Sequence, residues 1–232
     1  MINKVIQGDC LEVMKTIPDK SIDCIITSPP YEDIAGAGYT ANSKDILFLK
    51  LYSEFMDKLF IQYERILKDG GQLFFNVKSK TSNKTLRTPH WIEFTEAFKK
   101  LDFKSYIIWK YAGSFDSTNS RFHLDYEIIY HLSKGDIKLL PREEIKDPLT
   151  SIWYIPHNIK NRVHPTQMPE KVIENIIDRA NINGIVLDSF SGSGTTAVVC
   201  KRKRIDYIGI ELSKEYCDIA VSRLKAVPQN LF

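Results

Sequence analysis

Short apolar runs rich in β-branched residues alternate with amphipathic helical patterns along almost the whole chain of 232 residues. This alternation is typical of a mostly parallel sheet with helices on both faces, so we predict an α/β fold. The expected strands lie at 4–6, 22–27, 72–77, 104–110, 126–132, 185–188 and 207–210. The expected helices lie at 46–67, 91–101, 169–180, 195–204 and 214–227, and the first is expected to end in a glycine C-cap at 69–71.

Two stretches interrupt this alternation. Residues 32–44 contain two glycines, and residues 135–163 are rich in charge and proline. Neither stretch is expected to contain a buried element, so both are predicted to be surface structures near the binding edge of the sheet. The strands at 104–110 and 126–132 have no helix between them, which predicts an antiparallel pair at one edge.

Length, hydropathy and cysteine usage bound the class of protein. The length suits one domain, and no apolar run reaches the ~20 residues of a membrane span. The chain starts without a signal-peptide pattern, so a cytoplasmic location is expected. Four cysteines occur without C-x-x-C spacing, which predicts buried thiols rather than disulfides or metal ligands. No metal site is expected.

A glycine-rich motif follows the strand expected at 185–188, in the sequence "IVLDSFSGSGTTAVVC". Gly192, Gly194 and Ala197 have the G-x-G-x-x-A spacing that lets backbone N–H groups approach a ligand at a helix N-terminus. The next expected strand ends at Glu211, where a carboxylate can accept hydrogen bonds from both hydroxyls of a ribose. The pattern predicts a nucleoside-containing cofactor, and it leaves a dinucleotide and S-adenosylmethionine both open.

A second motif, "TSPPY" at 27–31, follows the apolar run "IDCII". Proline cannot donate to a strand ladder and restricts the residue before it, so two prolines hold the main chain away from the sheet. The motif therefore places Ser28, Pro29, Pro30 and Tyr31 in a stiff turn beyond the strand end.

The two motifs together resemble those of the amino-methylating DNA methyltransferases. Ser28-Pro29-Pro30-Tyr31 matches the pattern [DNST]-P-P-[YFW], and "DSFSGSGTT" is similar to D-x-F-x-G-x-G-T. The catalytic motif comes first and the glycine-rich motif comes late, as in the permuted β group of this family. The resemblance covers nearly the whole chain, except 32–44 and roughly 135–163. It implies a Rossmann-like, seven-stranded, mostly parallel sheet with both motifs at the carboxyl ends of neighbouring strands.

The resemblance also implies S-adenosylmethionine as cofactor. In "GDCLEVM" at 8–14 the family's acid, here Asp9, faces the adenine, and "HPTQMPEKVIENII" at 164–177 closes over the methionine end. Two positions depart from the family pattern: Ser189 replaces a common proline, a change of little expected weight, and Met168 replaces a common lysine. Backbone N–H groups near Thr166 and Thr195 are therefore expected to hold the methionine carboxylate. The implied cofactor-binding residues are Asp9, Cys10, Pro165, Thr166, Asp188, Phe190, Gly192, Gly194, Thr195, Thr196 and Glu211.

Amino methylation gives the TSPPY turn a chemical role. An exocyclic amine on a nucleobase is a poor nucleophile until acceptors draw on both of its N–H groups and free its lone pair. The carbonyl of Pro29 and the hydroxyl of Ser28 are the expected acceptors, and Tyr31 is expected to stack on a flipped-out base. Carbon-5 methylation is not expected, because the sequence contains no Pro-Cys pair to supply its nucleophile.

The target base is cytosine N4 or adenine N6. A serine at position 28 permits either base, and TSPPY with "HPTQMP" is more similar to the cytosine-N4 members, so N4 is favoured. The predicted function is site-specific DNA methylation in a restriction-modification system. Alternatives are methylation of RNA or of a protein amide, a DNA-binding module without turnover, and a nicotinamide-dependent oxidoreductase.

A basic region marks the expected DNA contact. Between 78 and 121 the chain has nine Lys or Arg and four acidic residues, a balance that favours a polyanion partner. The expected contacts with double-stranded DNA are Lys78, Lys80, Lys84, Arg87, Arg121 and His123. We predict one methyltransferase domain over 1–232 with a small target-recognition insert around 111–163. Such a short insert suits either a short recognition sequence or a homodimer that shares recognition.

Overall fold

The structure of the chain is a computed structural model. It describes residues 1–29, 46–77, 80–82, 86–88, 95–111, 125–137, 139–140, 150–157, 163 and 167–228. Within these residues, no helix has the combination of length and apolar character that crossing a membrane would require.

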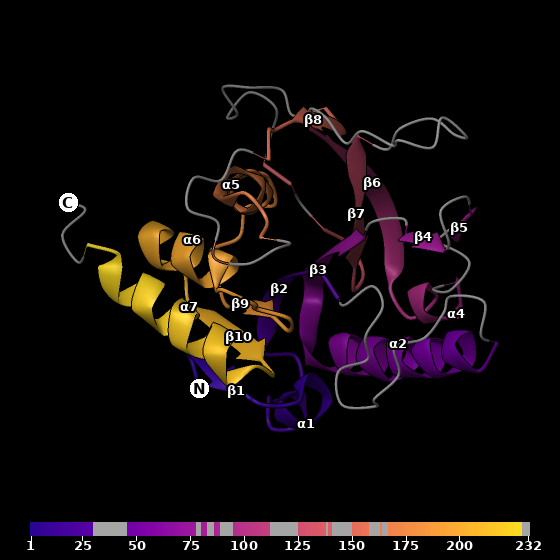
Figure 1. Ribbon diagram of the computed structural model, residues 1–232, viewed down its shortest axis with the longest axis horizontal. Coiled ribbons are helices and arrows are strands. Elements are labelled where there is room, and N and C mark those ends of the chain that lie inside the picture. Colours follow the sequence, from indigo (N-terminus) through magenta and orange to yellow (C-terminus); the bar gives the residue numbers. More distant parts are fainter. Residues whose placement is uncertain are drawn as a thin grey trace.

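An eight-stranded sheet forms the centre of the molecule (Figure 1). Seven of its strands run in one direction, and β7 alone is reversed, pairing antiparallel with β3 and with β6. In spatial order the strands are β1 (Lys4–Gln7), β10 (Tyr207–Glu211), β9 (Val186–Asp188), β2 (Ile22–Thr27), β3 (Leu67–Val77), β7 (Tyr126–Ser133), β6 (Asp102–Lys110) and β8 (Ile152–Tyr154). The predicted mostly parallel α/β fold is confirmed.

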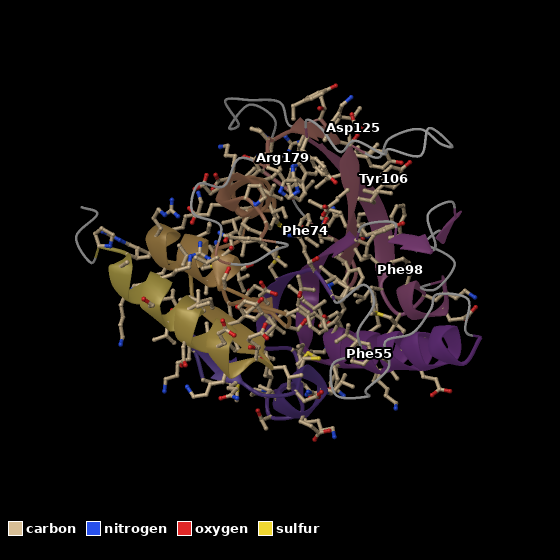
Figure 2. The ribbon with its side chains drawn as sticks, in the orientation of Figure 1. Phe55, Phe74, Phe98, Tyr106, Asp125 and Arg179 are labelled. Carbon is tan, nitrogen blue, oxygen red and sulfur yellow. The ribbon has the colours of Figure 1, made fainter. Side chains whose placement is uncertain are left out.

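Helices cover both faces of this sheet (Figure 1). One face packs against α1 (Cys10–Met14), α2 (Ile46–Ile66) and α4 (Thr95–Phe98), and the other packs against α5 (Glu170–Arg179), α6 (Thr195–Lys203) and α7 (Lys214–Ala226). The alternation of side chains along each strand separates the two cores. In β3, for example, Leu73 and Phe75 belong to the α2 core, whereas Phe74 belongs to the α5 core. In Figure 2, Phe55 lies on α2, and Phe74 lies toward α5.

The end of α2 differs from the prediction. The helix ends at Ile66 and β3 begins at the next residue, so the glycines at 70 and 71 are not a helix cap. The last carbonyls of α2 instead accept hydrogen bonds from the backbone N–H groups of Lys20 and Ser21, at 3.1 and 2.9 Å. Gly70, with φ of 79°, lies in an irregular start of β3 where its N–H donates to the Lys134 carbonyl at 2.7 Å.

The segment 135–163 also differs from the prediction, because part of it is buried. Residues 152–154 form β8, the edge strand beside β6, and so add an eighth strand to the seven expected. Trp153 is 5% exposed, and the buried Trp109 of β6 donates its indole N–H to the Ile155 carbonyl at 2.8 Å. The antiparallel pairing of β6 with β7 is confirmed, but β8 occupies the edge itself.

The structure also bears on the helix expected at 91–101 and on the four cysteines. Of the helix expected at 91–101, the structure has α4 at Thr95–Phe98, while residues 91–94 lie outside the described residues. The four cysteines are buried free thiols, as predicted.

Candidate active site

Asp188 ends β9 and is the centre of a buried hydrogen-bond network. Its Oδ1 accepts from the Thr27 hydroxyl at 2.9 Å and from the Phe190 N–H at 3.2 Å, and its Oδ2 accepts from the Thr196 hydroxyl at 2.7 Å. Burial raises the pKa of this carboxyl to about 6, and the three donors oppose that rise. Asp188 therefore joins β2, the glycine-rich turn and α6 at one edge of the sheet.

The glycine-rich turn lies between Asp188 and α6. Gly192 and Gly194 have φ of 50° and 79°, in the left-handed region that L side chains rarely adopt. A side chain at Gly194 would also place its Cβ 2.7 Å from the Cβ of Ala220 on α7. The turn thus delivers the N-terminus of α6 to the carboxyl edge of the sheet, where its first backbone N–H groups lack intrahelical partners.

Glu211 ends β10 and its carboxylate is fixed by backbone donors. Gly192 N–H donates to its Oε2 and Ser213 N–H donates to its Oε1, each at 2.8 Å. An ionised carboxylate has about four acceptor sites, so two bonds leave capacity for two hydroxyl donors. The side chain is half-buried rather than enclosed, which suits a carboxylate that takes both hydroxyls of a ribose.

Asp9 follows the end of β1, where Gln7 pairs with Glu211 and the Gly8 N–H donates to the Glu211 carbonyl at 2.9 Å. It is the N-cap of α1, where its Oδ1 accepts from the N–H groups of Leu11 and Glu12. Cys10 is buried, and burial raises the pKa of its thiol to about 12, so this thiol stays neutral. Phe190, from the glycine-rich turn, packs against Phe55 of α2 at 6.3 Å between ring centroids.

The residues present fit a nucleoside cofactor. A helix N-terminus preceded by two left-handed glycines, and an acceptor held by that same turn, are the features that such a ligand needs. Pro165 and Thr166, the predicted residues at the methionine end, lie outside the described residues.

Ser28 and Pro29 follow β2 at the same edge of the sheet. β2 pairs directly with β9, and the Thr27 hydroxyl bonds Asp188, so the TSPPY turn and the glycine-rich turn begin side by side. Ser28 is half-buried and Pro29 is buried, and the Asn76 side-chain amide of β3 reaches the Ser28 hydroxyl at 3.5 Å. Pro30 and Tyr31 lie outside the described residues.

Comparison with known proteins now gives the family. A family model described as DNA methylase, of the N6 and N4 type, matches residues 22–222 of the chain. The chain belongs to this family. Its predicted resemblance to the amino-methylating DNA methyltransferases is confirmed.

Individual relatives of this DNA methylase cover most of the chain. The type II methyltransferase M.BglII of Bacillus subtilis is 31% identical, over 99% of this chain and 71% of its own length. The structure of the PvuII DNA methyltransferase, titled cytosine-N4-specific, superposes with a TM-score of 0.81 at 19% identity, covering 98% of this chain and 87% of its own. The structure of the TTHA0409 protein of Thermus thermophilus, complexed with S-adenosyl-L-methionine, superposes with a TM-score of 0.77 at 23% identity. The match covers 98% of this chain and 95% of that chain.

The part that Ser189 plays in this DNA methylase was missed from the sequence. Ser189 is 1% exposed, and its hydroxyl lies 2.5 Å from the Tyr63 hydroxyl of α2 and 3.2 Å from the Thr27 hydroxyl. The Ser189 hydroxyl thus links α2, β2 and the glycine-rich turn, a structural role that was not predicted, and the expectation of little functional weight for Ser189 stays a prediction. The sequence did contain one sign of these hydrogen bonds, namely a side-chain hydroxyl at a position where proline is common in the family.

Arg223 of α7 was also missed. Its guanidinium donates to the Ser193 carbonyl at 2.7 Å and the Thr195 hydroxyl at 3.3 Å, and it pairs with Glu170 of α5 at 3.2 Å. It ties the glycine-rich turn to the start of α5, which lies in the sequence expected to close over the methionine end.

The predicted DNA contacts lie mostly beyond the described residues. Lys78, Lys84, Arg121 and His123 are outside them, so the prediction for these four stays a prediction. Lys80 lies on β4 (Lys80–Ser82) and Arg87 on β5 (Leu86–Thr88), which pair antiparallel as a separate ribbon. Because β4 follows shortly after the end of β3, this ribbon leaves the sheet at the same edge as the TSPPY turn.

Proposed function

We propose that this DNA methylase transfers a methyl group from S-adenosylmethionine to the exocyclic N4 amine of cytosine in a flipped-out nucleotide. The observation that carries the proposal is the direct pairing of β2 with β9, bridged by the Thr27–Asp188 hydrogen bond of 2.9 Å. This pairing supports the proposal because the TSPPY turn and the glycine-rich turn begin on neighbouring strands, and transfer between a base and a cofactor requires the two to be held close together.

The cofactor half of the site consists of β9, β10 and the start of α6. Glu211 is proposed to accept the two ribose hydroxyls, and Asp9 is proposed to lie toward the adenine. The N–H groups at the start of α6, from Thr195 onward, are proposed to hold the carboxylate of the methionine part, together with Thr166. When bound, S-adenosylmethionine supplies an electrophilic methyl group on a sulfonium. The remaining residues proposed to form the cofactor site are Cys10, Pro165, Asp188, Phe190, Gly192, Gly194 and Thr196.

The target half uses the TSPPY turn. The Pro29 carbonyl and the Ser28 hydroxyl accept hydrogen bonds from the two N–H groups of the amine, which frees its lone pair for in-line attack on the methyl carbon. The new N–C bond forms as the bond between the methyl carbon and the sulfonium sulfur breaks and leaves a neutral thioether, and the amine then loses one proton to solvent. Tyr31 stacks on the base, a contact worth roughly 1–3 kcal/mol that offsets part of the cost of flipping. The serine hydroxyl can accept a hydrogen bond from the amine of cytosine, or donate one to the ring nitrogen beside that amine. Adenine has the same two groups, so this feature does not separate the two bases.

The partner is proposed to be double-stranded DNA, approached over the β4–β5 ribbon and residues 111–163. The relatives named above include a type II methyltransferase, so we place the chain in a restriction-modification system. A homodimer and a cytoplasmic location belong to the same proposal.

The test is incubation of the protein with unmethylated genomic DNA and S-adenosylmethionine, followed by nucleoside mass spectrometry. N4-methylcytosine is the expected product. N6-methyladenine would overturn the choice of base and keep the chemistry, whereas methylation of RNA alone would overturn the choice of substrate.

A further inference from the structure

An arginine on α7 joins the glycine-rich turn to the start of α5. The side chain of Arg223 is 20% exposed. Its Nη1 donates to the Ser193 carbonyl at 2.7 Å, to the Ser193 hydroxyl at 3.2 Å and to the Thr195 hydroxyl at 3.3 Å. Its Nη2 donates to Glu170 Oε1 at 3.2 Å. Thr195 is the first residue of α6 and Glu170 is the first residue of α5, so one guanidinium holds the starts of two helices that lie on the same face of the sheet (Figure 1).

The chemistry of the guanidinium makes this connection a rigid one. Burial lowers the pKa of Arg223 and the neighbouring Glu170 opposes that shift, and a guanidinium is basic enough to stay protonated in proteins. Its N–H donors are fixed in one plane, so the spacing between the groups that it binds is fixed as well. The amine of a lysine is a single point and could not replace both ends of this fork.

The two helix starts that Arg223 reaches are formed without side-chain caps. The N-cap residues, Gly194 of α6 and Pro169 of α5, make no side-chain cap hydrogen bond. The first backbone N–H groups of a helix lack intrahelical partners and can bind an anionic group such as a carboxylate. Gly194 is also left-handed, and glycine has many other conformations open to it. A contact from outside the turn is needed to hold it, and Arg223 supplies one at the carbonyl that directly precedes Gly194.

These contacts lie at one end of the proposed cofactor site. Arg223 bonds to the turn at Ser193 and Thr195, which follow Gly192. The proposed ribose acceptor Glu211 is held separately, by the N–H groups of Gly192 and Ser213. The start of α6 is the part proposed to hold the methionine carboxylate, and α5 directly follows the sequence proposed for that same end. Arg223 is therefore expected to affect the amino-acid part of the cofactor and to leave the nucleoside part unaffected.

We propose that Arg223 is a positioning residue for the amino-acid part of S-adenosylmethionine. By holding Ser193 and Glu170 at a fixed spacing, it fixes the start of α6 against the start of α5, and with them the backbone N–H groups that receive the methionine carboxylate. Arg223 acts through these groups and does not touch the cofactor. Their position matters more in this chain because Met168 stands where many family members have a lysine. This inference rests on the proposed cofactor site.

The experiment compares two ligands that differ in the amino-acid part. S-adenosylhomocysteine carries it, whereas 5′-methylthioadenosine ends in a methyl group, and both contain adenosine and a neutral thioether. Each hydrogen bond to a charged group contributes about tenfold or more to an equilibrium constant, so Arg223→Gln should raise the dissociation constant for S-adenosylhomocysteine at least tenfold. The constant for 5′-methylthioadenosine, measured by competition, should stay within threefold. Lys225→Gln, which removes an exposed cation two positions further along α7, is the matched control and should change neither constant.

A conservative variant separates positioning from a general structural effect. Arg223→Lys keeps the charge and loses the planar fork, so it should raise the constant for S-adenosylhomocysteine by about three- to tenfold and again spare 5′-methylthioadenosine. This variant provides the same test if Arg223→Gln does not fold. Equal losses for the two ligands, or an unchanged affinity for S-adenosylhomocysteine, would overturn the proposal. Failure of the wild-type protein to bind S-adenosylmethionine would instead overturn the proposed function together with it.

Discussion

The two halves of the sheet edge are held together in different ways. On the cofactor half, most hydrogen bonds of the two carboxylates are to residues nearby in the sequence. Asp188 accepts from residues 2 and 8 positions away, and Glu211 accepts from residues 2 and 19 positions away. The bond from Thr27 to Asp188 is the long-range exception among these. On the target half, the contacts Asn76–Ser28, Asn76–Glu127 and Trp109–Ile155 span 48, 51 and 46 positions. The cofactor half is thus largely a local motif, whereas the target half exists only when distant strands pair correctly. Variants should therefore affect the two halves separately.

The largest effect is expected for Glu211→Ala on the cofactor half. It removes a charged acceptor for two hydroxyls, each bond being worth about 1.5–3 kcal/mol, so cofactor binding should weaken by about 3–6 kcal/mol. Calorimetric titration with S-adenosylmethionine measures this loss, with Glu215→Gln as an exposed control. An unchanged affinity would remove Glu211 from the ribose site.

Asp188, whose bond with Thr27 joins the two halves, carries a carboxyl buried in the protein. Asp188→Asn tests how much the ionisation of this buried carboxyl changes the free energy of unfolding. The pKa of Asp188 is about 6 in the folded protein, against 3.8 ordinarily. The folded state therefore holds the proton more tightly, and the contribution of Asp188 to stability is full below about pH 4 and is lost as the pH rises through about 6. Relative to the non-titrating variant, the wild type should lose about 3 kcal/mol of unfolding free energy between pH 3 and pH 7. Denaturant unfolding of both proteins across this range measures it; a difference that does not vary with pH would contradict the assignment.

Tyr31→Ala should act on the target half alone. Loss of base stacking removes roughly 1–3 kcal/mol, so transfer to DNA should slow by about 5- to 150-fold while cofactor affinity stays the same. Tyr31→Phe, which keeps the ring, should restore most of the rate. Single-turnover assays give the rate, and wild-type turnover by the alanine variant would exclude Tyr31 from the site.

The smallest effect is expected for Tyr63→Phe, which tests the link from α2 to both halves. Its hydroxyl bond to Ser189 is buried, and a lost bond of this kind costs about 1 kcal/mol of unfolding free energy. Tyr207→Phe, on β10, is a matched control because no hydrogen bond to its hydroxyl is found in the described part of the chain. Equal free energies of unfolding for the two variants would mean that the hydrogen bond between the Tyr63 and Ser189 hydroxyls does not stabilise the protein.

The same contrast explains what could be predicted from the sequence. The β9–turn–α6 unit and Glu211 were predictable because glycine spacing and a following acid act within one supersecondary unit. The contact between Glu127 and Asn76 could not be predicted, because an acid in an apolar strand reaches that amide only when β7 is reversed in the sheet. Likewise, β8 was missed because three residues within a charged, proline-rich segment show no period, and pairing with β6 is what makes them a strand.

The Asp-Gly-Gly of 69–71 shows the other kind of failure. Its composition fits a helix cap, but the carbonyls that a cap would satisfy are taken by Lys20 and Ser21 from another part of the chain. The glycines are then free to form the irregular start of β3. A local signal was correct about conformation, since Gly70 is left-handed, and wrong about the element to which it belongs.

The central claim is that the glycine-rich turn and Glu211 form the site of a methionine-derived methyl donor beside the TSPPY turn. Parallel calorimetric titrations of the wild-type protein with S-adenosylmethionine and with NAD test it most directly. We expect saturable binding of S-adenosylmethionine and none of NAD; tight binding of NAD without binding of S-adenosylmethionine would contradict this claim.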